Sequence, residues 1–112
     1  MNPLAESLVR RKSAPCEGRP ALSDAELAPL LAALPDWTRE GDTLVREFRF
    51  ANHYETQAFA NVVMWLSHRE DHHPDLAVGY NRIRVAYSTH SVGGLSDNDF
   101  ICAAKLDLLH AL

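Results

Sequence analysis

Residues 67–91 read SHREDHHPDLAVGYNRIRVAYSTHS, and four of the six histidines of the chain lie within them. His72 and His73 are adjacent and are followed directly by Pro74, which disfavours a helical conformation at the residue before it. The histidine pair therefore marks the place where a helix ends and a strand begins. After Pro74, apolar residues alternate with polar ones up to His90, as expected for two strands joined by a short turn.

The helix before this stretch is the clearest element that the sequence predicts. It begins near Asn52, because Asn52 and Glu55 have the spacing of an N-terminal cap. Its apolar stripe consists of Phe59, Val62, Val63 and Leu66. Further apolar residues extend this stripe round most of the circumference, so the helix must be covered on more than one side. We expect one side to pack on a sheet and another to meet a second subunit.

An earlier helix is predicted to begin after Ser23. Ser23 and Glu26 have the spacing of a capping box, in which each side chain bonds to the backbone N–H of the other residue. Leucines then recur with helical spacing until Pro35, which ends the helix. Pro29 falls in the second turn and removes one backbone hydrogen bond, so the sequence predicts a kink there or a later start.

The remaining segments complete an alternating order of helices and strands. Residues 37–39 and 43–50 are predicted to be strands joined by a hairpin loop over 40–42. A last helix is predicted from Asp97 to about Ala111, because Ser96 and Asp99 form a second capping pair. The resulting order is helix, strand, strand, helix, strand, strand, helix. It predicts an α+β domain with a four-stranded, mostly antiparallel sheet and three helices on one face.

The N-terminal segment, residues 1–20, is expected to be irregular, because prolines and glycine interrupt any periodicity. Its first dozen residues are interpreted as a mobile tail, whereas residues 13–18 have packing against the body as an alternative. Residues 21–112 are then one domain, which suits a chain of 112 residues.

Composition excludes several classes of protein. The net charge of −4 and the pI near 5.8 argue against an electrostatic nucleic-acid binder. No apolar run approaches the length of a membrane span, and no apolar stretch follows the basic residues 10–12 as in a signal peptide. Cys16 and Cys102 are expected to be free thiols in a reducing cytoplasm, because two cysteines do not make a disulfide framework.

The histidines suggest acid–base chemistry first. Histidine is the side chain whose unperturbed pKa allows it both to accept and to donate a proton near neutral pH. We therefore interpret His72, His73 and His90 as a proton-transfer site. A metal site is a weaker alternative: His68 and His72 share a helical face, with His90 as a third ligand, but neither H-E-x-x-H nor H-x-x-E-H is present. Purely structural histidines are the third reading, which we prefer for His53 and His110.

Several further residues match a known pattern. They are His72-His73-Pro74, Tyr80, Ser88-Thr89-His90, Gly94-Leu95-Ser96 and Asp99, with His68 four residues before the first histidine of the pair. In these motifs the sequence resembles the pterin-4a-carbinolamine dehydratases, also known as dimerisation cofactors of a homeodomain transcription factor. The resemblance extends from Pro15-Cys16-Glu17-Gly18 through the last helix. It departs from the family at His68, where a glutamate is common, and at Leu76, where many members carry an aromatic residue.

The resemblance implies a reaction and a site. The reaction is dehydration of 4a-hydroxytetrahydropterin to quinonoid dihydropterin, without metal or cofactor, by a homodimer or homotetramer. This step recycles the pterin used by aromatic amino-acid hydroxylases. His72 and His90 would be the acid–base pair, and His73 would line the same pocket. Substrate-binding positions would be Pro74, Ser88 and Thr89.

Two further residues and the function itself each have an alternative interpretation. Asp99 has the spacing of a helix cap, with the alternative role of a carboxylate that orients His90. For His68, a polar residue at the end of a helix, we favour a surface or structural role, with an orienting role at the site as the alternative. The competing function is a non-catalytic binding module of the same fold that acts as a transcriptional cofactor or an assembly partner.

Overall fold

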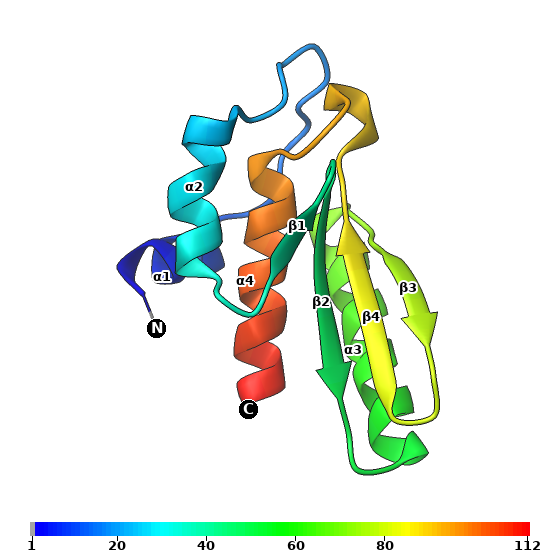
Figure 1. The fold of residues 1–112 in the computed structure, drawn as a ribbon. Coiled ribbons are helices and arrows are strands. Elements are labelled where there is room, and N and C mark those ends of the chain that lie inside the picture. The colour runs from blue at the N-terminus through cyan, green and yellow to red at the C-terminus, as the bar shows by residue number, and fades with distance from the viewer. Residues whose placement is uncertain (1) are drawn as a thin grey trace.

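The structure is a computed structural model, and it describes residues 2–112. It confirms the α+β class and the order of the predicted helices and strands, with one additional helix at the N-terminus (Figure 1). The described residues form α1 (Pro3–Arg10), α2 (Asp24–Ala33), β1 (Thr38–Glu40), β2 (Thr43–Arg49), α3 (His53–Glu70), β3 (Asp75–Val78), β4 (Arg82–Tyr87), the 3-10 helix η1 (His90–Val92) and α4 (Asp97–Ala111).

The sheet has the strand order β1-β2-β4-β3, and every neighbouring pair is antiparallel. β1 and β2 form a hairpin whose turn contains Gly41 at φ +60°, a conformation that glycine adopts without a steric penalty. β3 and β4 form the second predicted hairpin. The two hairpins meet along β2 and β4, so the C-terminal end of β4 lies in the middle of the sheet, next to the start of β2.

One face of the sheet carries the core of the protein. Leu44, Phe48, Ile83, Val85 and Tyr87 are fully buried on this face, since the register pairs Leu44 with Tyr87 and Phe48 with Ile83. The long helices α3 and α4 contribute to the same core cluster. The predicted placement of helices on one face therefore has a physical basis in the alternation along β2 and β4.

The structure corrects the expectation for the N-terminal segment. Pro3 does not prevent a helix there but begins one, because a proline at the first helical position gives up an N–H that would have no partner within the helix. The Asn2 side chain caps α1 by accepting from the backbone N–H of Leu4 at 2.7 Å. Ala5 and Leu8 are buried in the core cluster, and α1 packs against α4 and α2. Residues 2–12 therefore contribute a helix to the packed domain.

The helix boundaries follow from their caps. Both predicted capping boxes are present, at Ser23 with Glu26 and at Ser96 with Asp99. Pro29 lies inside α2, which is helical throughout Asp24–Ala33. Helix α3 ends at Asp71, which takes the left-handed conformation at φ 49°, and the chain turns there towards the histidine pair. Within residues 2–112, no helix is both long and apolar enough to cross a membrane.

Candidate active site

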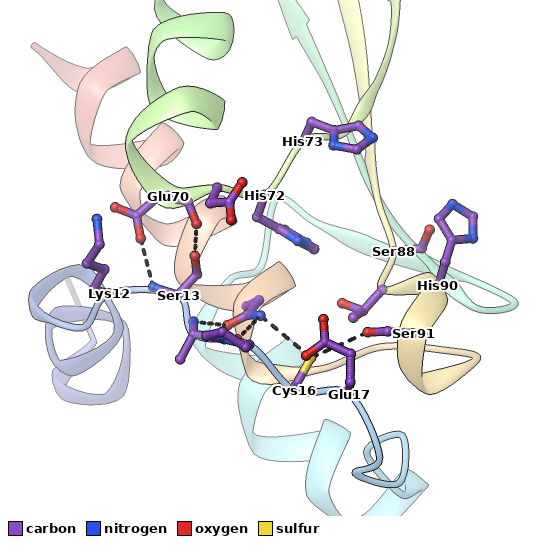
Figure 2. A pocket seen from close by; sticks show the side chains of 15 residues that line it. Lys12, Ser13, Cys16, Glu17, Glu70, His72, His73, Ser88, His90 and Ser91 are labelled. Carbon is purple, nitrogen blue, oxygen red and sulfur yellow. Dashed lines mark hydrogen bonds between the residues drawn. The ribbon is translucent and has the colours of Figure 1, made fainter.

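A pocket of about 520 Å³ opens where the C-terminal ends of α3 and β4 meet the segment between α1 and α2. Figure 2 shows its side chains from close by. Its lining consists of Lys12, Ser13, Ala14, Pro15, Cys16, Glu17, Glu70, Asp71, His72, His73, Ser88, Thr89, His90, Ser91 and Asn98. The structure thus brings together the three histidines that the sequence predicts to act together, although they come from two different loops.

His72 is the most firmly held of the three histidines. Its Nε2 atom lies 2.7 Å from Oδ1 of Asp99, and only 12% of its side chain is exposed. The imidazole also stacks on the ring of Tyr87, with 5.8 Å between the ring centroids and 9° between the planes. The structure therefore corrects one expectation: Asp99 bonds to His72 rather than to His90.

Asp99 is fully buried, and its second carboxylate oxygen is also engaged. Oδ2 accepts hydrogen bonds from Oγ1 of Thr89 at 2.8 Å and from the backbone N–H of Ser96 at 2.9 Å. A carboxylate can only accept, so Nε2 of His72 donates in this hydrogen bond, and whenever the imidazole is neutral its Nδ1 atom keeps a free lone pair. The arrangement suits His72 to accept a proton and stabilises the charge that results.

His73 and His90 differ from His72 in their surroundings. Both are exposed, and both line the pocket, His73 just after α3 and His90 at the start of η1. In Figure 2 they lie at the upper and right-hand sides of the pocket, with Ser88 beside His90. Two solvent-accessible imidazoles near a third that is held by a carboxylate provide the donor and the acceptor that an acid–base reaction requires.

The other predicted site residues divide into two groups. Ser88 and Thr89 line the pocket, but the hydroxyl of Thr89 is directed at Asp99 and is buried. His68 is exposed on α3, and neither His68 nor Pro74 belongs to the pocket lining. The side chain four residues before His72 therefore does not face the pocket.

One wall of the pocket comes from residues for which the sequence offered packing against the body as an alternative. Residues 12–17, which we call the strap, cross from α1 towards α2 along the pocket (Figure 2). Asn98 exchanges two hydrogen bonds with the backbone of Ala14, at 3.0 and 2.8 Å. The Sγ atom of Cys16 lies 3.8 Å from Oγ of Ser91. The predicted alternative, in which residues 13–18 pack against the body, is therefore confirmed, although the residues that hold this wall are distant along the chain.

Glu70 holds the N-terminal end of the strap, at Ser13. Its side chain is 5% exposed; Oε1 accepts from the backbone N–H of Ser13 at 2.9 Å, and Oε2 accepts from Nζ of Lys105 at 2.9 Å. Burial alone would raise the pKa of Glu70, but the hydrogen bonds from Ser13 and Lys105 outweigh it and hold this pKa below its ordinary value. Glu70 is therefore a charged anchor for the strap, with both oxygens occupied.

Neither cysteine forms a disulfide in the described part of the chain. Cys16 and Cys102 are both free, and burial raises the pKa of the Cys102 thiol to about 12, which keeps it protonated at neutral pH. Among the described residues, no three His, Cys, Asp or Glu side chains are grouped so that they could hold a metal ion.

Comparison with known proteins identifies the family. The chain is 52% identical over 110 residues, 97% of each chain, to a Nitrosospira multiformis protein whose name places it among the pterin-4-alpha-carbinolamine dehydratases. A Dechloromonas aromatica protein with the same kind of name is 53% identical over 92% of this chain and 93% of its own length. The crystal structure of a transcriptional coactivator/pterin dehydratase from Brucella melitensis matches with a TM-score of 0.76 and 27% identity, over 80% of this chain and 97% of that one. The family model described as pterin 4 alpha carbinolamine dehydratase matches residues 20–109, so the chain belongs to this family.

Proposed function

We propose that the protein dehydrates 4a-hydroxytetrahydropterin to quinonoid dihydropterin, with His72, His73 and His90 as its proton-transfer groups. The observation that carries the proposal is the convergence of three imidazoles on one pocket, one of which is held by the buried Asp99. Family membership supplies the class of substrate.

The chemistry requires one proton to be removed and another to be delivered. The bond between C4a and its hydroxyl oxygen breaks, the oxygen takes the electron pair and a proton, and water leaves. The N5–H bond supplies the electrons of the new C4a–N5 double bond, and its proton passes to a base. We assign the base to His72, because Asp99 stabilises the imidazolium that forms. The exposed His73 and His90 supply the proton to the departing hydroxyl.

Substitution of single histidines tests this assignment. We expect His72→Ala and His90→Ala each to lower the enzymatic rate by about 10²–10⁴-fold, the usual contribution of one general acid or base. The measurement is stopped-flow dehydration of the carbinolamine, with the spontaneous rate subtracted. His53→Ala and His68→Ala are matched controls, because these two exposed histidines do not line the pocket. Full activity in both active-site variants would contradict the assignment of His72 and His90 as proton-transfer groups.

A non-catalytic binding role remains the alternative function. The Brucella melitensis neighbour carries the word coactivator in its title, and large apolar side chains such as Met64 and Trp65 are exposed on α3. A pocket with three histidines favours the enzyme, because a binding module does not need them. Absence of turnover by the unaltered protein, together with a stable stoichiometric protein partner, would favour the binding role over the enzyme.

A further inference from the structure

We propose that Glu17 is the residue that positions the substrate, by accepting hydrogen bonds from the 2-amino group and the N3–H of the pterin ring. The inference rests on the proposed function and extends it to the strap, which precedes the residues that the family model matches. It concerns substrate recognition, whereas the histidines concern proton transfer.

The hydrogen-bonding groups of the pterin ring determine which partners the pocket must provide. Its pyrimidine edge carries two parallel N–H donors, the 2-amino group and N3–H, and a carboxylate can accept both at once, as it does from an arginine side chain. This edge lies at the far end of the ring system from N5. When N5 and the C4a hydroxyl are held at the histidines, the donor edge must face the wall on the other side of the pocket.

The strap forms that wall. Figure 2 shows the Glu17 side chain rising from the strap towards the interior of the pocket, on the side of His72 away from His73. Within residues 2–112, the Glu17 carboxylate makes no hydrogen bond and no ion pair, so both oxygens are available to a ligand. The strap is held three and four residues before Glu17, because Asn98 holds Ala14 and Glu70 holds Ser13.

The other acidic residues of the pocket are less suited to this role. Glu70 is buried, and its two oxygens are taken by Ser13 and Lys105. Asp71 is exposed and lines the pocket, but it directly precedes His72 at the end of α3 and therefore belongs to the histidine side. Glu17 is therefore the acidic residue of the described pocket lining that the strap offers as an acceptor.

The test compares two ligands that differ only at this edge. In 6-methyl-7,8-dihydropterin position 2 carries an amino group, whereas in 6-methyl-7,8-dihydrolumazine it carries an oxygen, which accepts rather than donates. Binding of each to the purified full-length protein is measured by titration calorimetry. We expect the unaltered protein to prefer the pterin and Glu17→Gln to reduce this preference about tenfold, since a bond to a charged group is lost. The same variant should raise KM for dehydration more than it lowers kcat.

Asp71→Asn is the matched control, because it also removes one negative charge from the pocket and because asparagine tolerates the left-handed conformation. It should keep the ligand preference. A Glu17→Gln protein that prefers the pterin as strongly as the unaltered protein would overturn the inference, even with dehydration intact. An unaltered protein that neither binds the pterin nor dehydrates the carbinolamine would overturn the proposed function and this inference together.

Discussion

The Nε2 atom of His72 lies 2.7 Å from Oδ1 of Asp99, and this contact joins two residues that are 27 positions apart in the chain. It connects the loop after α3 to the first turn of α4. Asp99 serves two purposes, because its other oxygen completes the capping box at Ser96 while Oδ1 holds the imidazole. The start of α4 and the orientation of His72 therefore depend on the same carboxylate.

Replacement of Asp99 by asparagine should impair proton transfer more than binding. An amide cannot stabilise the imidazolium of His72 as a carboxylate does, so we expect kcat for dehydration to fall about 10²-fold. KM should change little, because the Asp99 side chain is buried behind His72. Steady-state kinetics over a range of substrate concentrations separate the two effects.

Asp97→Asn is the control for this experiment. Asp97 lies in the same first turn of α4, but its carboxylate pairs with Arg11 at the surface and does not line the pocket. We expect its kcat to equal that of the unaltered protein. Equal losses in both variants would mean that the helix terminus matters, and that the contact with His72 does not.

The sequence predicts the fold well where local signals decide it. The capping pairs at Ser23 and Ser96 place two helix starts correctly, and alternation along residues 82–87 identifies a strand with one buried face. The expectation at Pro3 was wrong because proline, which is unfavourable at most helical positions, is favourable at the first one. Whether a helix formed there depended on Ala5 and Leu8 finding the surface of α4, which no local pattern reveals.

The residue types of the candidate site were predictable from the sequence, but the histidine that Asp99 contacts was not. The adjacent histidines and His90 stand out by composition alone. The partner of Asp99 depended on the exact path of the loop after α3, where Asp71 takes a left-handed conformation and the chain turns. Packing of residues 13–18 against the body was an alternative that the sequence offered, but the residues that hold the strap could not be predicted, because Glu70 and Asn98 bind it across 57 and 84 positions of sequence.

Tyr87 leads to a prediction about stability. Its ring stacks on His72, but its hydroxyl is buried and has no hydrogen-bond partner among the described residues. Burial raises the pKa of this hydroxyl well above its ordinary value, so it stays neutral. Because an unsatisfied buried hydroxyl costs free energy, Tyr87→Phe should raise the free energy of unfolding by about 1 kcal/mol. Urea denaturation at neutral pH measures the change.

Tyr87→Leu is the informative companion, because it also removes the hydroxyl but loses the aromatic ring. We expect it to destabilise the fold by about 2 kcal/mol through lost packing. Dehydration activity should persist in Tyr87→Phe and decline in Tyr87→Leu, since only the second loses the ring that fixes the plane of His72. A destabilised Tyr87→Phe protein would show that the hydroxyl has a partner after all.

Glu70 makes the stability of the protein depend on pH. Its pKa in the folded state lies below the ordinary value of 4.5, so the unfolded state binds more protons in acid. The contribution of Glu70 to stability is therefore present above about pH 4.5 and is lost as the pH falls through the lower folded pKa. At pH 7, Glu70→Gln should lower the free energy of unfolding by about 2 kcal/mol, because Lys105 keeps a charge without its partner.

The difference between Glu70→Gln and the unaltered protein should shrink as the pH is lowered below 4. Urea denaturation at pH 7, 5 and 3 follows it. Glu47→Gln is the control, because Glu47 forms an ion pair with Arg49 at the surface, where such pairs contribute little. A difference that stays constant over the whole pH range would show that the Glu70 charge does not act as described.

The exposed apolar side chains of α3 lead to a prediction about assembly. Met64 is 62% exposed and Trp65 is 53% exposed, whereas Val63 and Leu66 beside them are buried. Large apolar side chains at neighbouring surface positions are typical of a protein interface. We therefore expect light scattering to give a mass of at least twice the 12.5 kDa of one chain.

Trp65→Glu should raise the dissociation constant of this assembly at least about tenfold, because a buried Trp contributes more than the 1.4 kcal/mol that a tenfold change represents. Leu112→Glu provides the comparison, since Leu112 is 94% exposed at the end of the chain and should tolerate a charge without any change in mass. A mass of one chain for the unaltered protein at micromolar concentration would contradict the interface, and dissociation by both variants would place it elsewhere than on α3.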